Sequence, residues 1–416
     1  MPLQSGTPLR LALPNTPARH GLPLHLAMPN TQAQPGLPLH AAMPNTPAQP
    51  GAPLHLAMPS TPVQTGAPTP AARPGQDRAR LRAAEQGLRH IHDPLQRARQ
   101  ANELVRELRG PEPGLSMYYG VPRNGPKHNG VIDSSAPMDE GAVRTLVRGA
   151  AAKGREAVFG VDGGATPAER ARLHADGAKL AEKISFADLN KRLGKIGPDA
   201  SPAERKKAIQ ETLTFLKDKL KNSGSDYLQI DELPSTFKDK PGARNTVRNL
   251  APLLRKMEGT ELDKKLILWG RFGAPPSHKT VDAYAPALSE ARLRARSVVY
   301  ESYASRGKIN QRALLPEEVA GPRAARDIEA TVRAFEQRVP GITSASSTGL
   351  GLFTNAAQPR FGLPNSGYDG IVRSMAEQVA EGPYSQFQQG TAIYALGRRP
   401  TDRSAQEFAN LLAGLP

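Results

Sequence analysis

A proline-rich phrase repeats at the start of the chain and rules out regular secondary structure there. Gly6, Gly21, Gly36, Gly51 and Gly66 fall at one fifteen-residue spacing, and four copies share the pattern G-x-P-L-x-x-A-x-P-[NS]-T. Proline fixes φ and lacks an N–H donor, so neither a helix nor a β-ladder continues through such frequent prolines. The period is also shorter than the roughly 20 to 50 residues of stacking solenoid repeats. We therefore expect residues 1–76 to be disordered.

Two interpretations of the repeat stay open, and a third is disfavoured. The segment has no acidic residue before Asp77 and could serve as an extended linker. It could also present one short binding motif several times, because repetition raises the effective concentration of a motif. The apolar anchors of that motif would be Leu24, Leu26, Met28, Leu39 and Leu54. Metal binding is disfavoured because one histidine per copy gives no ligand cluster, and we expect no metal site.

Composition excludes several classes of site and of membrane segment. The chain has no cysteine, which removes disulfides, thiolate metal sites and cysteine nucleophiles. No apolar run reaches the roughly 18 residues of a transmembrane helix, and prolines interrupt the start of the chain where a signal peptide would need an apolar stretch. The net charge of +16 could attract nucleic acid, anionic membranes or acidic proteins.

Two segments follow the repeat. Residues 77–110 predict a basic helical hairpin, because apolar residues recur at helical spacing and eight arginines lie between 78 and 109. Such a hairpin could dock a partner or simply present a solvated face. Residues 111–165 predict a loop-rich linker, with a short strand at 116–119 and a helix near 139–152.

Residues 166–416 carry the clearest folding signals. Thr166 and Ser201 each begin the pattern [ST]-P-A-E, a capping box with proline at the first helical position. Further helices are predicted at about 286–305, 322–339, 368–381 and 402–413, and strands at 266–269 and 391–396. About 250 residues suffice to bury a core. The predicted fold class is an α-rich α+β domain with few strands.

No motif in the chain settles a reaction. VFGVDGGAT at 158–166 looks like the phosphate-binding turn of sugar kinases, but Thr166 is expected to cap a helix, which favours a flexible joint at Gly163-Gly164. No Walker lysine, protein-kinase triplet, H-E-x-x-H or G-x-S-x-G occurs. Whether the chain is an enzyme stays undecided from the sequence.

The C-terminal part is similar to mono-ADP-ribosyltransferases over about 130 residues. A strand candidate ends near Arg271, a serine-rich segment follows with Ser344 and Ser346, and a third strand candidate lies at 390–396. The resemblance implies that the arginine and the serine-rich strand bind NAD. The catalytic glutamate of the family is missing, since the corresponding segment reads SQFQQG and the nearest acid is Glu381. The resemblance therefore implies either an ADP-ribosyltransferase-like enzyme or an inactive relative of one. NAD is the expected cofactor only if this resemblance holds, and otherwise no cofactor is expected.

The whole chain resembles type III secretion effectors of plant-associated Gram-negative bacteria. The features are an acid-free N-terminus, tandem short repeats, no cysteine, basic charge and a later globular module. The resemblance implies a secreted virulence protein whose N-terminal segment, residues 1–76, contains an unfolded secretion signal. It also implies that the protein acts in the host cytoplasm, mainly through protein–protein interaction. Host proteins are the expected partners and a secretion chaperone is a further candidate. The alternatives are the ADP-ribosyltransferase-like enzyme and a nucleic-acid-binding protein.

Overall fold

The structure is a computed structural model, which describes residues 75–125, 127–128, 131–132, 135–161, 165–235, 237, 242–270, 272, 275–303, 305–306, 313–351, 365–394 and 404–416. The repeat region and its anchors Leu24, Leu26, Met28, Leu39 and Leu54 lie outside these residues.

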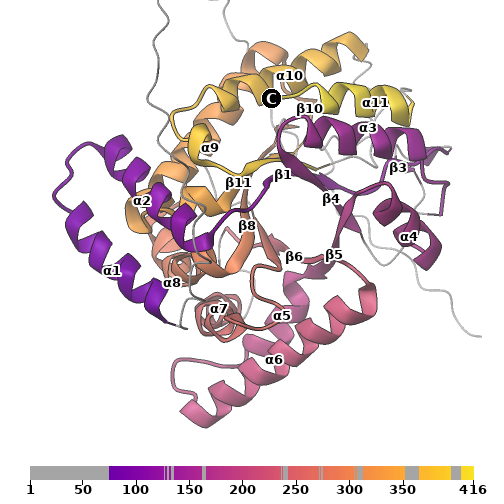
Figure 1. Ribbon diagram of the computed structural model, residues 1–416. Coiled ribbons are helices and arrows are strands. Elements are labelled where there is room, and N and C mark those ends of the chain that lie inside the picture. The colour runs from indigo at the N-terminus through magenta and orange to yellow at the C-terminus, as the bar shows by residue number, and fades with distance from the viewer. Residues whose placement is uncertain are drawn as a thin grey trace, which may run out of the picture. The chain divides into compact units, whose positions relative to one another are not determined.

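Eight parallel strands close into a barrel, with helices around it (Figure 1). Each strand pairs with the next barrel strand along the chain, and the last pairs with the first. The barrel strands are β1 (Gly114–Tyr119), β4 (Arg155–Val161), β5 (Lys179–Ser185), β6 (Tyr227–Leu233), β7 (Leu266–Gly270), β8 (Ala295–Tyr303), β11 (Ser346–Gly351) and β12 (Gly390–Tyr394). Two short antiparallel hairpins lie outside it: β2 (Lys127–His128) with β3 (Val131–Ile132), and β9 (Ser305–Arg306) with β10 (Ala313–Leu314).

Helices alternate with the barrel strands, as parallel neighbours require a crossover connection. The α-helices are α1 (Gln76–Leu88), α2 (Pro94–Arg109), α3 (Glu140–Ala151), α4 (Pro167–Ala175), α5 (Phe186–Leu193), α6 (Pro202–Ser223), α7 (Ala243–Met257), α8 (His278–Arg294), α9 (Glu317–Arg338), α10 (Asn365–Ala380) and α11 (Ala405–Ala413). Two 3₁₀ turns are η2 (Ile342–Ala345) and η4 (Ser385–Phe387). The capping boxes predicted at Thr166 and Ser201 are confirmed, and Ser404 forms a third.

The predicted α-rich α+β fold with few strands is wrong, because the described chain contains a closed parallel β/α barrel. The error has a physical cause. In a barrel strand one face packs on helices and the other fills the interior, and here the interior face carries charged residues such as Glu156, Lys183 and Asp231. These charges break the continuous apolar run that usually marks a buried parallel strand.

Two further corrections concern boundaries. The segment 111–165 is not a loop-rich linker but part of the barrel: the strand and the helix predicted within it are confirmed as β1 and α3, and β4 follows them. The helix expected at 286–305 is two elements: α8 ends at Arg294 and β8 begins at Ala295 without a loop. The hairpin expected within 77–110 is present as α1 and α2.

Side chains divide between an outer and an inner core. On β6, Leu228 and Ile230 point outward to the helices, whereas Tyr227 belongs to the inner cluster. The inner cluster also holds Leu115, Met117, Val158, Ala181, Ile267, Trp269, Val299 and Ala392. This alternation places Gln229 and Asp231 inside the barrel, because successive strand residues point to opposite faces.

The α1–α2 hairpin is held to the amino-terminal end of the barrel, the end at which the strands begin. Arg109 is 6% exposed and donates to the carbonyl oxygens of Arg292 and Ala295 at 3.0 and 2.8 Å. Glu85 on α1 pairs with the buried Arg292 at 2.6 Å. Several arginines of the basic hairpin therefore stabilise its packing on the barrel.

A buried network fills this end of the barrel. Arg296 is 3% exposed and donates to Glu156 and to the carbonyl oxygen of Pro113, and the hydroxyl of Tyr227 donates to Glu156 at 2.8 Å. Burial by itself lowers the pKa of Arg296, but Glu156 and Tyr227 together more than offset it and the pKa is raised.

Candidate functional site at the carboxyl ends of the barrel strands

Polar and aromatic side chains gather where the barrel strands end. We call this set the carboxyl-terminal mouth, and it comprises Tyr119 (β1), Lys183 (β5), Asp231 (β6), Trp269 (β7), Glu301 and Tyr303 (β8), and Tyr394 (β12). In parallel β/α barrels the active site lies at this end, and its residues come from several different strands. The mouth is therefore the candidate active site.

Asp231 is the charged centre of one side of the mouth. It is 5% exposed, and its Oδ2 lies 3.1 Å from the ammonium of Lys183 and 3.3 Å from the hydroxyl of Tyr119. Lys183 also lies 5.2 Å from the centroid of the Tyr119 ring. Both of these contacts fall on Oδ2 of the carboxylate.

The backbone directly after Asp231 is irregular. Glu232 has a φ of 59°, and the register of β6 with β7 shifts between Ile230 and Leu233. A bulge of this kind re-aims side chains at a strand end, and a positive φ in a residue other than glycine costs free energy. The irregularity therefore marks the end of β6 as a position where the fold accommodates local strain.

A second carboxylate, Glu301 on β8, belongs to the same mouth. Its Oε2 accepts a hydrogen bond from the indole Nε1 of Trp269 at 3.2 Å. A Cβ on Gly351 would lie 2.9 Å from Oε1 of Glu301 and 2.5 Å from Cδ1 of Tyr303. The glycine on β11 therefore gives both side chains the space that they occupy.

Aromatic rings join the two carboxylates. The centroid of the Tyr119 ring lies 4.7 Å from that of Tyr394 and 5.9 Å from that of Trp269. The ring of Tyr303 meets that of Tyr394 edge-on at 6.5 Å. Such rings offer apolar faces next to polar groups, which suits a ligand with both kinds of surface.

The residues predicted from the sequence lie elsewhere. Arg271 is outside the described residues. Ser344 and Ser346 are buried at the amino-terminal end of β11 and donate to the carbonyl oxygens of Gly341 and Thr343, each at 2.9 Å. Glu381 is exposed and directly follows α10. The structure thus separates the two serines from the mouth by the length of a barrel strand.

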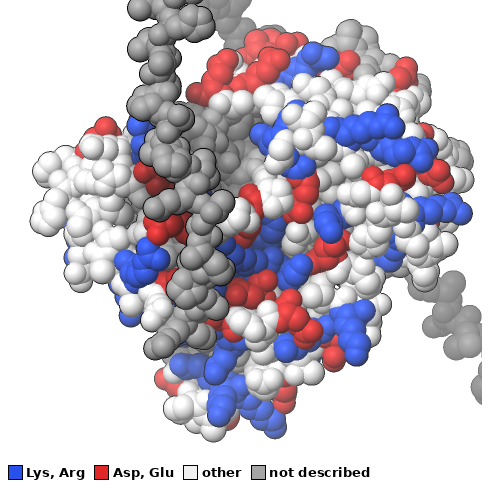
Figure 2. Space-filling model, in the orientation of Figure 1, with Lys and Arg blue, Asp and Glu red and all other residues white. Residues whose placement is uncertain are grey.

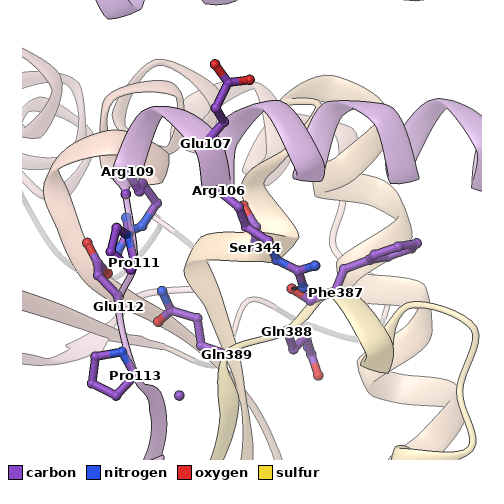
Figure 3. Close-up of a pocket in the computed structure, with 12 residues that line it drawn as sticks. Arg106, Glu107, Arg109, Pro111, Glu112, Pro113, Ser344, Phe387, Gln388 and Gln389 are labelled. Carbon is purple, nitrogen blue, oxygen red and sulfur yellow. Dashed lines mark hydrogen bonds and ion pairs between the residues drawn. The ribbon is translucent and has the colours of Figure 1, made fainter. Parts of the chain in front are cut away.

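A pocket of about 570 Å³ lies beside Ser344 at the amino-terminal end of the barrel (Figure 3). Arg106 reaches from α2 toward Phe387 and donates to its carbonyl oxygen at 2.9 Å, whereas Glu107 points away from the pocket. Arg109 pairs with Glu112, and Gln389 accepts a hydrogen bond from Arg296 at 3.1 Å. These polar groups serve the packing of α2 on the barrel.

Sequence reasoning missed every residue of the mouth. For Asp231, the signal that could have found it is the alternation over residues 228–231, where Gln229 and Asp231 alternate with Leu228 and Ile230. Glu301 has no such signal, because it follows the apolar run Val298–Tyr300 of β8 and lies within the segment expected to be a helix.

Among the described residues, no group of three His, Asp or Glu side chains is placed to hold a metal ion. None of the described helices is both long enough and apolar enough to cross a bilayer.

Comparisons with known proteins identify no family. No protein-family profile and no curated protein matches the chain. Among solved structures, the chain is similar to an endo-β-N-acetylglucosaminidase from Cordyceps militaris, with 13% identity, a TM-score of 0.44 and coverage of 78% of this chain and 96% of that one. A GH18 chitinase from Pseudoalteromonas aurantia has 11% identity, a TM-score of 0.40 and coverage of 72% and 99%. A glucosidase from Croceicoccus marinus has 9% identity, a TM-score of 0.41 and coverage of 73% and 68%.

Proposed function

We propose that the barrel is a hydrolase of glycosidic bonds, with Asp231 and Glu301 as its two catalytic carboxylates. The observation that carries the proposal is the geometry of the mouth: two carboxylates from β6 and β8, each held by a hydrogen bond, with aromatic rings between them. Glycoside hydrolysis uses a pair of carboxyl groups on either side of the bond that is broken. The aromatic rings supply flat apolar faces against which a sugar ring can lie.

The contacts favour different roles for the two carboxylates. Lys183 compensates the charge of Asp231, which suits this group to act as the ionised carboxylate that attacks the anomeric carbon, activates water or stabilises the positive charge that develops there. Glu301 then donates the proton to the leaving oxygen. The indole of Trp269 fixes the orientation of Glu301.

The test compares Asp231→Asn and Glu301→Gln on aryl glycosides with good and poor leaving groups. We expect Asp231→Asn to lower kcat/KM by about 10³-fold or more on both, because it removes charge stabilisation. We expect Glu301→Gln to be strongly impaired only with the poor leaving group, because an activated leaving group departs without a proton.

The matched control is Glu182→Gln. Glu182 lies on β5 but on its outer face, where it pairs with Arg170 at 2.9 Å. This variant should retain wild-type kcat/KM. The proposal is ruled out if the wild type hydrolyses no glycoside, or if Asp231→Asn leaves kcat/KM unchanged.

We also propose, from the sequence, that the chain is an effector delivered into host cells and that its repeats contribute to binding host proteins. The acid-free repeat region supports this proposal. A hydrolase in the folded part is compatible with it, since delivery and catalysis use different parts of the chain. An ADP-ribosyltransferase-like activity with NAD stays a prediction from the sequence.

Nucleic-acid binding also stays a prediction from the net charge. On the face shown in Figure 2, Lys and Arg residues are interspersed with Asp and Glu over much of the described surface. Many arginines also have carboxylate partners, such as Arg78 with Glu290 and Arg294 with Asp263. This mixture of positive and negative side chains does not favour a polyanion such as nucleic acid as the ligand.

A further inference from the structure

Gln229 is a buried amide for which the described structure provides no partner. It lies on β6, two residues before Asp231, and points into the barrel. Its side chain is fully buried, and neither Oε1 nor Nε2 has a hydrogen bond to any residue that the structure describes. Buried polar groups in folded proteins are nearly always hydrogen-bonded, so an exception calls for a reason.

Other polar side chains inside the described barrel have partners. Asp231 has Lys183 and Tyr119, and the hydroxyls of Ser297 and Ser347 lie 2.9 Å apart. The network around Arg296 satisfies the charges at the opposite end. The barrel interior therefore pairs its polar groups well, and the amide of Gln229 stands apart from this pattern.

The amide lies next to the mouth. A Cβ on Gly160 would be 3.0 Å from Oε1 of Gln229 and 3.6 Å from Cδ2 of Tyr119. Gly160 on β4 thus makes room for the amide, and the ring of Tyr119 lies against the same glycine. The amide therefore lies beside the Tyr119 ring, which also contacts Asp231.

A methionine or leucine at position 229 would fill a similar volume without an unmade hydrogen bond. Replacing a buried unpaired polar group by an apolar one of similar shape is neutral or stabilising. A glutamine here therefore costs stability in the free protein, as is common for groups that serve a ligand.

We propose that Gln229 is a specificity-determining residue that binds a hydroxyl or amide substituent of the substrate at the inner end of the mouth. Such a substituent both donates and accepts, so it satisfies the carbonyl oxygen and the N–H of the same side chain. The proposal rests on the function proposed above. It adds to that site a subsite deeper in the barrel than Asp231.

The test uses Gln229→Met, with Ile267→Met as the control for repacking. Ile267 pairs in register with Gln229 and belongs to the inner cluster. Two measurements are made on each variant: Tm, and kcat/KM for a hydrolysed glycoside and for analogues that each lack one hydroxyl or amide substituent.

We expect Gln229→Met to keep or raise Tm and to lower kcat/KM for the full glycoside by about 10- to 100-fold. For the analogue that lacks the substituent bound by Gln229, wild type and Gln229→Met should have equal kcat/KM, because neither enzyme can make that contact. Ile267→Met should show no such dependence on the substituent.

The alternative is that a buried water satisfies the amide. Gln229→Met would then lower Tm below that of Ile267→Met, and kcat/KM would change equally for every analogue; this result would overturn the inference. If the wild type is active and kcat/KM of Gln229→Met stays within twofold of wild type on every substrate, the inference about Gln229 is overturned but the proposed function is not. A wild type that hydrolyses no glycoside would overturn the proposed function together with it.

Discussion

Two buried tyrosines of the outer core differ in a single hydrogen bond. The hydroxyl of Tyr284 donates to the carbonyl oxygen of Pro234 at 2.9 Å. The hydroxyl of Tyr300 is equally buried and has no partner among the described residues, although its ring stacks on that of Phe335 with centroids 5.6 Å apart. Comparing the two tyrosines therefore separates the contribution of a buried ring to the free energy of unfolding from the contribution of its hydroxyl.

Phenylalanine should therefore act differently at the two positions. Tyr300→Phe should leave the free energy of unfolding unchanged or raise it, because it removes an unpaired buried hydroxyl. Tyr284→Phe should lower it by about 1 kcal/mol, the usual net worth of a hydrogen bond. Urea unfolding at pH 7 measures both, and a larger loss for Tyr300→Phe would contradict the assignment.

These two tyrosines, together with the buried Tyr118, determine how stability responds to alkaline pH. Burial raises the pKa of Tyr118 to about 12, and it also raises those of Tyr284 and Tyr300. An unfolded tyrosine loses its proton near pH 10, whereas the folded one keeps it. The stability is therefore fully present below about pH 10 and falls as the pH rises toward 12. In each phenylalanine variant this fall should be smaller.

At the scale of elements, closure of the barrel depends on the pairing of β12 with β1. Gly390 begins β12 with a φ of 154°, and a Cβ there would lie 2.0 Å from the carbonyl oxygen of Leu115, its register partner on β1. The carbonyl oxygen of Leu115 belongs to the backbone of a paired strand, so it cannot move away from the new Cβ as the end of a flexible side chain could. The first pair of this interface therefore requires glycine.

Gly390→Ala should consequently lower the free energy of unfolding by about 3 kcal/mol or more, the range of severe backbone and packing defects. The control is Gly154→Ala, which has a φ of 65° but no atom within 4 Å of the new Cβ and should cost about 1 kcal/mol. Urea unfolding of both variants makes the comparison; equal losses would show that the contact with Leu115 is unimportant.

Elements differed in how far the sequence predicted them. Helices with a capping box were found at their first residue, because the cap is local and both partners lie within four residues. The strands β5 and β6 were missed, because the charge of Lys183 and Asp231 inside the barrel is compensated between strands that lie 48 residues apart in the sequence. No local pattern records such compensation.

At the scale of the whole molecule, the sequence predicts that export depends on the repeat region. A reporter fused behind residues 1–76 should be exported by bacteria with a working type III secretion system and retained by a secretion-deficient strain. The unfused control is residues 77–416, which should be retained by both. Export of the fusion by the deficient strain would contradict the effector proposal.

The sequence alone determined the properties that depend on neighbouring residues or on composition: the proline pattern of the repeat, the absence of cysteine chemistry, and the helix starts at Thr166 and Ser201. Only the tertiary structure decided the barrel and its mouth. Asp231, Lys183, Tyr119 and Glu301 meet because eight parallel strands close on one another, and parallel pairing joins residues that are distant along the chain.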